Sequence, residues 1–274
     1  MKSATTTLHQ DLVKHPDIFC GKKELNALTM GDAQENYRLN YRDAQEHQLL
    51  GDVSATYTML PDFPGVPAKA KSLLGPEIKI VYLVREPVSR ALSHHQHMMN
   101  DVTKAKMGPD VNTEIRKHPA PINYSRYAHQ LQPWIDQFDR QNIYVIKFED
   151  YISDREQVLK DLFGFLGVEA REIEIESAGA NRGNQKRVAG KFIYRLYHTK
   201  LFQRIIKPFS PAMLRSALRN VLLRKSKVTS IPPTLETIDF IVESVQDDVS
   251  KLHTLLEWSE PAWDFAKVRA RYSS

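Results

Sequence analysis

The chain has 274 residues, 42% of them hydrophobic, which is enough to bury the core of one large domain. Its single cysteine, Cys20, excludes an intramolecular disulfide framework and a cysteine-rich metal site. The formal net charge is +5, yet residues 177–235 hold 13 Lys/Arg and no Asp or Glu. We expect this stretch either to meet an anionic partner or to form a solvated surface.

No apolar run approaches the ~18 residues that a membrane-spanning helix needs. No apolar segment follows the N-terminus as it would in a signal peptide. We therefore predict a cytoplasmic chain, with possible peripheral membrane contact through residues 187–227.

The chain begins "MKSATTTLHQDLVKHP", where three threonines precede apolar residues at helical spacing from Leu8. This pattern predicts a loop that runs into a helix. A lysine and several hydroxyls at a helix N-terminus are the parts of an anion site, because the exposed N–H groups and the dipole favour negative charge. A disordered polar tail is the alternative interpretation.

Apolar stretches further along the chain predict strands, and periodic stretches predict helices. The strands are expected at 49–57, 78–84 and 143–150. The helices are expected at 88–99, 126–138, 153–166 and 236–256. Strands that alternate with helices predict an α/β fold, with a mostly parallel sheet flanked by helices.

A basic segment follows, in which residues 187–227 mix aromatics, leucines and regularly placed cations. It predicts two basic amphipathic helices, and ordinary surface helices with solvated faces are the alternative. We expect one domain over 1–274, made of an α/β core (1–186), a basic helical segment (187–229) and a C-terminal helical part (230–274).

The stretch "IKIVYLVREPVSRALSHHQHMM" is the most informative of the sequence. Arg85 follows a buried strand at its carboxyl end, where open α/β sheets bind ligands. Pro87 starts a helix that carries Arg90 and Ser93. An arginine fork and a hydroxyl placed in this way can converge on one phosphate.

These segments resemble the sulfotransferase family that uses 3′-phosphoadenosine 5′-phosphosulfate (PAPS) as donor. The family's 5′-phosphosulfate loop is similar to "KSATTTL", with an alanine where glycine is more usual, and its "RxPxxRxxS" motif is matched from Arg85 to Ser93. The resemblance implies a P-loop-like sheet, PAPS as donor and no metal. It implies these donor contacts: Lys2, Ser3, Ala4, Thr5, Thr6, Thr7, Arg85 and Ser93.

Other segments resemble the carbohydrate branch of that family, which includes heparan-type and bacterial enzymes. "HPDIFCGKKELNAL" implies that Glu24 is the catalytic glutamate, and "NRGNQKR" implies that Lys186 and Arg187 bind the adenosine phosphate. "GDVSATY" is similar to the branch's "EKSxxY" strand, but Asp52 and Val53 replace Glu–Lys. The implied acceptor is a glycan, a glycolipid or a small hydroxylated molecule, and no nucleic acid is expected as a partner.

The resemblance also implies a mechanism. Lys2 stabilises charge on the leaving nucleotide, and Glu24 accepts the acceptor's proton with a modestly raised pKa. A surface ion pair with Lys22 or Lys23 is the alternative for Glu24. His95 is a reserve candidate for the base.

Two residue types invite other interpretations. The spacing of His94, His95 and His97 does not place three metal ligands on one helical face, so we expect a structural or acceptor-lining role. Trp134 and Trp263 lie in helical apolar patterns, and we expect them in the core.

In the family the donor loop follows a buried first strand, whereas here Met1 directly precedes the loop. We expect the native gene to encode an apolar strand of about five or six residues upstream. Two other functions compete. A P-loop kinase is one, although the G-x-x-x-x-G-K-[ST] signature is missing. The other is a vestigial nucleotide-binding protein whose basic segment docks on an anionic partner or a membrane.

Overall fold

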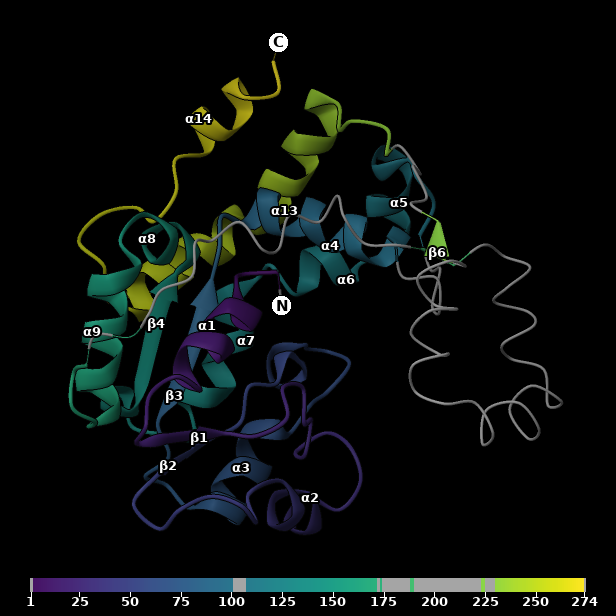
Figure 1. Cartoon of the computed structure of the whole chain (residues 1–274). Coiled ribbons are helices and arrows are strands. Elements are labelled where there is room, and N and C mark those ends of the chain that lie inside the picture. The colour runs from purple at the N-terminus through teal and green to yellow at the C-terminus, as the bar shows by residue number, and fades with distance from the viewer. Residues whose placement is uncertain are drawn as a thin grey trace, which may run out of the picture.

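The computed structural model describes residues 2–100, 107–171, 173 and 230–273, together with the backbone of 188–189 and 223–224. Figure 1 shows the arrangement of helices and strands. The elements of these ranges are α1 (Thr5–Leu12), β1 (Ile18–Cys20), α2 (Ala33–Asn40), β2 (Leu49–Gly51), η1 (Ala55–Thr58), α3 (Val66–Leu74), β3 (Ile80–Val84), α4 (Pro87–Asn100), α5 (Val111–Lys117), α6 (Ala120–Asn123), α7 (Tyr127–Ile135), η2 (Arg140–Asn142), β4 (Ile143–Lys147), α8 (Phe148–Ser153), α9 (Arg155–Leu166), β5 (Val188–Ala189), β6 (Leu223–Arg224), α13 (Leu235–Leu255) and α14 (Phe265–Ala270).

The strands of the α/β core form two parallel pairs. β1 pairs with β2, and β3 pairs with β4 over its whole length, from Ile80 opposite Ile143 to Val84 opposite Lys147. Helices α4 to α7 lie between β3 and β4 in the sequence, and a connection of this kind allows two strands to run parallel. The predicted α/β class, with short parallel sheets flanked by helices, is confirmed.

Different helices cover the two faces of the β3–β4 pair. Tyr82 and Val84 face a core that contains residues of α3, α7 and α13. Leu83 and Ile146 face the opposite core, which contains residues of α1, α8 and α9. Successive residues of a strand point to opposite faces, so an apolar strand buried between two helical layers needs no polar alternation.

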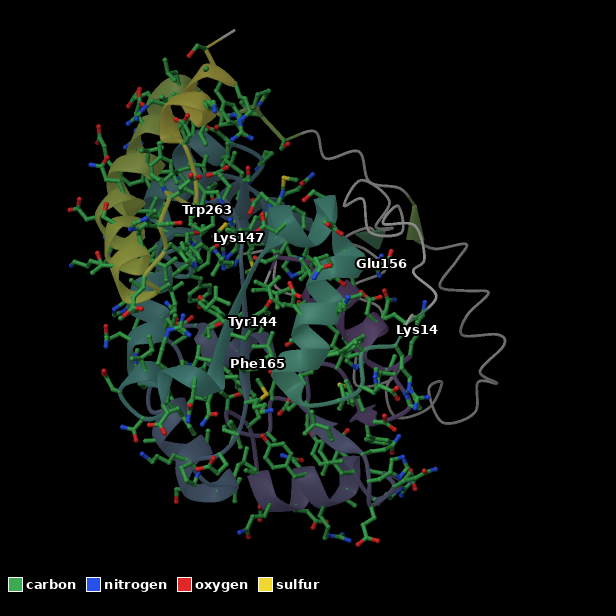
Figure 2. All side chains as sticks on the ribbon, turned by 90° about the vertical axis from the view of Figure 1, so that its left-hand side faces the viewer. Lys14, Tyr144, Lys147, Glu156, Phe165 and Trp263 are labelled. Atoms are coloured by element: carbon green, nitrogen blue, oxygen red, sulfur yellow. The ribbon has the colours of Figure 1, made fainter. Side chains whose placement is uncertain are left out.

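Aromatic residues fill both cores. Trp134 and Trp263 belong to the core on the α7 side and are 5% and 9% exposed, which confirms their predicted place. On the other face, Tyr144 of β4 stacks on Phe165 of α9, with ring centroids 5.1 Å apart (Figure 2).

Two predicted strands end earlier than the sequence indicated. Of residues 49–57, only Leu49–Gly51 form a strand, and the 3-10 helix η1 begins at Ala55. The Tyr57 hydroxyl donates to Asp52, a contact that a fully extended strand cannot make across five residues. Residues 143–150 are extended only to Lys147, where α8 begins. Its first turn holds Glu149 and Asp150, whose charges favour a helix N-terminus.

The predicted helices are confirmed as α1, α4, α7, α9 and α13, although α7 ends at Ile135, three residues before the predicted end. Asp154 caps α9 by accepting the Gln157 N–H, and Thr234 caps α13 by accepting the Thr237 N–H. None of the described helices combines the length and the apolar character needed to cross a membrane.

α13 packs against α4 and α7. The buried carboxylate of Asp248 accepts the N–H groups of Ala128, at 3.0 Å, and of His129, at 3.2 Å, so α13 caps the first turn of α7 from another part of the sequence. Burial raises the pKa of Asp248, while these N–H groups act to lower it. The C-terminal part of the chain therefore fixes α7.

The predicted basic segment lies almost entirely outside the described residues. The exceptions are β5 and β6, whose backbones pair as antiparallel strands, although the sequence predicted helix at both positions. A pair of strands needs the two ends of the segment to meet, which periodicity within the segment cannot show. Lys186 and Arg187 also lie outside the described residues.

Candidate active site

The loop before α1 has an unusual backbone. Lys2 and Ala4 adopt left-handed conformations, with φ of 71° and 63°, although neither is glycine. Within the described residues no side-chain hydrogen bond caps α1, so its first N–H groups remain available. The loop and the exposed Thr6 therefore present the parts of an anion site at a helix N-terminus, as the sequence predicted.

Arg85 connects the end of β3 to this loop. Its Nη1 donates to the Lys2 carbonyl at 3.1 Å, and its guanidinium lies 4.5 Å from the ring centroid of Phe148. The Tyr127 hydroxyl holds the backbone of Arg85, because it donates to the Arg85 carbonyl at 2.7 Å and accepts the Arg85 N–H at 3.1 Å. The structure thus brings together two predicted donor contacts that lie more than 80 residues apart.

The rest of the predicted 3′-phosphate motif divides into two roles. Ser93 is half-buried on α4, and its hydroxyl makes no hydrogen bond with the described residues. Arg90 is only 2% exposed, and its Nη1 donates to the Pro121 carbonyl at 3.0 Å and to the Ser125 hydroxyl at 3.1 Å. Arg90 therefore joins α4 to the α6 region, whereas the Ser93 hydroxyl remains able to bind a ligand.

Glu86 caps α4. Its carboxylate accepts the N–H groups of Val88, at 2.6 Å, and of Ser89, at 2.9 Å. The carboxylate of Glu149 accepts the N–H of Glu86 at 2.8 Å and the indole N–H of Trp263 at 3.2 Å. The N-terminus of α4 is therefore already neutralised by protein carboxylates.

Glu24 lies in a loop between β1 and α2, with a left-handed φ of 57°. Its Oε1 accepts from Lys23 Nζ at 2.7 Å, and its Oε2 accepts from the Ala55 N–H of η1 at 3.0 Å. The side chain is 39% exposed. The ion pair that the sequence left open as an alternative is present, but the exposed carboxylate can also reach a ligand.

The expected raised pKa of Glu24 is wrong. Burial acts to raise the pKa, but the hydrogen bonds from Lys23 and Ala55, with the charge of Lys23, outweigh it and hold the pKa below its usual range. Glu24 is consequently ionised at neutral pH. Its predicted role as base remains a prediction.

The histidines of α4 are buried. His95 is 2% exposed, its Nε2 lies 2.9 Å from the Gly108 carbonyl, and burial lowers its pKa. His94 stacks on Tyr124, and burial together with the charge of Arg90 lowers its pKa to about 2. Both imidazoles are therefore neutral at neutral pH. In the described part of the chain, no hydrogen bond joins His95 to Lys2, Glu24 or Arg85.

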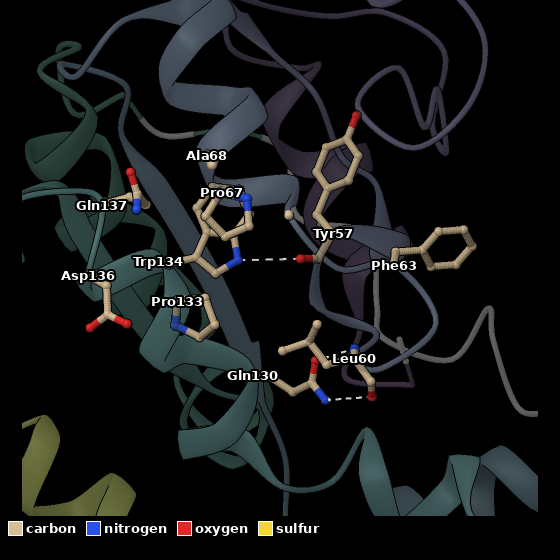
Figure 3. Close-up of a pocket in the computed structure, with 11 residues that line it drawn as sticks. Tyr57, Leu60, Phe63, Pro67, Ala68, Gln130, Pro133, Trp134, Asp136 and Gln137 are labelled. Carbon is tan, nitrogen blue, oxygen red and sulfur yellow. Dashed lines mark hydrogen bonds between the residues drawn. The ribbon is translucent and has the colours of Figure 1, made fainter.

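A pocket of about 230 Å³ lies between η1, α3 and α7 (Figure 3). Its walls are mainly apolar and include Tyr57, Phe63 and Trp134. The Trp134 indole N–H donates to the Tyr57 carbonyl at 3.3 Å, and the Gln130 amide bonds both the N–H and the carbonyl of Leu60. These bonds hold η1 and the residues that follow it, and η1 also carries the Ala55 N–H that binds Glu24 Oε2.

Three residues that position the site were not predicted from the sequence. Tyr127 and Phe148 hold Arg85, but they lie 42 and 63 residues further along the chain, so no local pattern connects them to it. Glu86 was detectable, because an acidic residue directly before a proline that starts a helix is a capping signal.

Residues 65–182 match the family model of the sulfotransferase domain, which confirms the resemblance found in the sequence. A sulfotransferase from Alicyclobacillus acidocaldarius has a similar fold over 96% of this chain and 94% of that chain, with 20% identity and a TM-score of 0.65. A mouse sulfotransferase complexed with PAP is similar over 93% of this chain and 86% of that chain, with 16% identity and a TM-score of 0.47. No curated protein sequence matches the chain.

Proposed function

We propose that this chain, with a sulfotransferase domain matched at residues 65–182, transfers a sulfuryl group from PAPS to a hydroxyl or an amine. The observation that carries the proposal is the contact between the uncapped start of α1 and the arginine at the end of β3. An open helix N-terminus and a guanidinium beside it suit a ligand with two separate anionic groups.

The donor-binding roles follow from this arrangement. The N–H groups of the first turn of α1 and the hydroxyls of Thr5, Thr6 and Thr7 bind the 5′-phosphosulfate, and Lys2 stabilises the charge that grows on the leaving nucleotide. Arg85 and Ser93 bind the 3′-phosphate, which distinguishes this donor from ordinary adenosine nucleotides. The hydrogen bond from the Arg85 guanidinium to the Lys2 carbonyl keeps the two phosphate subsites at a fixed separation.

Glu24 is the proposed base. Sulfuryl transfer is an in-line displacement like phosphoryl transfer, so the acceptor's hydroxyl becomes acidic as its oxygen bonds to sulfur. An ionised carboxylate held by Lys23 and Ala55 accepts that proton without prior deprotonation of its own. Its low pKa makes it a weak base, and the late acidity of the hydroxyl compensates for this weakness.

The proposed acceptor is a glycan, a glycolipid or a small hydroxylated molecule. This proposal rests on the resemblance to the carbohydrate branch and on the excess of positive charge in the sequence of residues 187–227. An anionic acceptor drawn by those charges loses affinity as salt is added, because exposed charges are screened over ~8–10 Å at moderate ionic strength. An acceptor KM that is independent of salt would remove this support.

The donor half of the proposal is tested by calorimetric titration with adenosine 3′,5′-bisphosphate in the absence of magnesium. Adenosine 5′-monophosphate, which lacks the 3′-phosphate, is the matched control. Tight binding of the bisphosphate alone supports the proposal, whereas a preference for ATP with magnesium supports a kinase. An array of acceptors incubated with PAPS and read by the mass shift of one sulfate then tests transfer.

A further inference from the structure

The loop that carries Glu24 is held in a costly conformation. Glu24 and Asn26 both adopt left-handed backbone angles, with φ of 57° and 56°. Residues other than glycine persist there only where the surroundings impose the conformation. The question is which residues impose it.

The contacts that hold this loop come from residues 53–56. The Glu24 N–H donates to the Val53 carbonyl at 2.9 Å, and the Asn26 N–H donates to Ser54 Oγ at 2.9 Å. The Thr56 hydroxyl donates to Asn26 Oδ1 at 2.7 Å. The same segment supplies the Ala55 N–H that binds the Glu24 carboxylate.

Asp52 orients the Ser54 hydroxyl, which accepts the Asn26 N–H. The Ser54 hydroxyl donates its proton to Asp52 Oδ1 at 2.6 Å. A hydroxyl has one proton, so donation to a carboxylate leaves its lone pairs for the Asn26 N–H. A hydroxyl that donates to a charged acceptor is also a stronger acceptor itself.

Two tyrosines keep the Asp52 carboxylate in place. The Tyr57 hydroxyl donates to Asp52 Oδ2, and the Tyr37 hydroxyl donates to the same oxygen at 3.2 Å. Burial, followed by the bond to Asp52, raises the pKa of Tyr57 to about 12, and burial with the charge of Asp52 raises that of Cys20 to about 12. These neighbours therefore stay protonated at neutral pH, and the tyrosine hydroxyls remain donors to Asp52.

We propose that Asp52 is a positioning residue for the reaction, which acts through Ser54 to hold the Asn26 N–H and so keeps the Glu24 carboxylate on the Ala55 N–H. The proposal rests on the proposed function in one respect, namely that Glu24 is the base. It goes beyond the resemblance, because Asp52 stands where the sequence departs from the family pattern.

The first test is independent of activity. The pKa of the Glu24 carboxyl is measured by ¹³C NMR titration in the full chain and in the Ser54→Ala and Asp52→Asn variants. We expect a rise toward the ordinary value of 4.5 in both, because Glu24 loses the Ala55 N–H. For Asp52→Asn the direction of the Glu24 pKa change distinguishes two effects. Removal of a nearby negative charge alone would lower the pKa, whereas loss of the Ala55 N–H raises it.

The second test uses turnover with an acceptor from the array. Ser54→Ala and Asp52→Asn should each lower kcat about 10-fold with an unchanged donor KM, as expected when a base is misplaced by about an ångström or less. In a Glu24→Gln background they should cause no further loss. Ser54→Thr, which keeps the hydroxyl, should retain activity, and the exposed Asp43→Asn and Ser250→Ala changes are matched controls.

An unchanged Glu24 pKa in Ser54→Ala overturns the inference, and so does an equal further loss of kcat in the Glu24→Gln background, which indicates a purely structural role. Full activity of Glu24→Gln by itself contradicts the proposed base and leaves the NMR result to judge Asp52. If Asp52→Asn does not fold, Ser54→Ala carries both measurements, because it removes one hydroxyl oxygen only.

Discussion

Two helices, α1 and α4, start beside Arg85, and their N-termini differ in capping. α1 begins after a left-handed loop, is preceded by Lys2 and has no side-chain cap in the part of the chain that the structure describes. α4 begins after Glu86, whose carboxylate binds two of its first N–H groups. Both helices carry the same partial positive charge at this end, but only α1 leaves it available to an external anion.

Under the proposed function, the two helix starts bind a doubly anionic donor in different ways. The α1 end offers backbone N–H groups, whereas α4 offers the Ser93 side chain and, through its capped start, a rigid support. A motif that resembles a family's phosphate-binding motif is therefore not enough to place a phosphate at that helix end. The capping residue decides whether the end is free.

The largest effect is expected from the residue that joins the two helix starts. Arg85→Ala should weaken binding of adenosine 3′,5′-bisphosphate by roughly 2–4 kcal/mol, about 30- to 700-fold, because a charge-assisted contact is lost. Calorimetric titration measures this change, and the exposed Arg42→Ala is the matched control. Equal affinity of Arg85→Ala and the parent chain would contradict the assignment.

Glu24 lies at neither helix start, so its replacement should separate catalysis from donor binding. Glu24→Gln should reduce kcat about 100-fold or more, as for loss of a general base. The bisphosphate affinity should stay within the error of the titration. Parallel losses in affinity and turnover would show that Glu24 supports the fold of the site instead.

A carboxylate placed at the uncapped N-terminus of α1 should neutralise its partial positive charge, as Glu86 does for α4. Thr6→Glu puts a negative charge on the exposed first turn, where it should weaken bisphosphate binding about 10-fold while it stabilises the helix by roughly 0.3–1 kcal/mol. Gln10→Glu, in the last turn of α1, should do neither. Titration measures the loss of bisphosphate affinity, and thermal unfolding measures the gain of stability. Weaker binding in both Thr6→Glu and Gln10→Glu would point to a general charge effect.

Removal of the α4 cap should lower the stability of the protein and leave donor binding nearly unchanged. Glu86→Ala leaves two buried N–H groups without their acceptor and should lower the free energy of unfolding by roughly 1–2 kcal/mol. Chemical denaturation measures this loss. The bisphosphate affinity should change much less than in Arg85→Ala, and a comparable loss would mean that the α4 start also binds the donor.

The smallest effect is a pH dependence of stability. The pKa of Glu24 is lowered in the folded chain, so folding favours its ionised form. The resulting stabilisation is fully present above the ordinary value of 4.5 and is lost as the pH falls through the lower folded value. The free energy of unfolding should therefore change less between pH 3 and pH 6 in Glu24→Gln than in the parent chain, as measured by chemical denaturation. Identical pH profiles of the two proteins would contradict a lowered pKa of Glu24.

The elements that the sequence predicts well are those specified locally. β3 is a continuous apolar run, and α13 has a threonine cap followed by long periodicity. The strand predicted at 49–57 is too long, because η1 begins at Ala55 and Asp52 bonds to Tyr37 and Tyr57, which alternation of apolar residues does not encode.

The candidate site follows the same rule. The loop before α1 and Arg85 could be identified from their own neighbourhoods, and the fold brings them into contact, while their shared role in donor binding stays a prediction. The pKa of Glu24 was predicted in the wrong direction, because it depends on Ala55, 31 residues away, as well as on the adjacent Lys23. Sequence patterns indicate which groups are present, while their protonation depends on partners brought by the fold.

The bond between Asp248 and the first turn of α7 also bears on the order in which the molecule is assembled. Tyr127 orients Arg85, and the turn that carries Tyr127 is fixed by a carboxylate 120 residues later in the chain. During synthesis from the N-terminus, the loop before α1 and β3 are made before α13, which carries the carboxylate that fixes the start of α7. We therefore expect a nascent chain that lacks α13 not to hold Arg85 in its final orientation, because the turn that carries Tyr127 has no carboxylate to fix it until α13 docks.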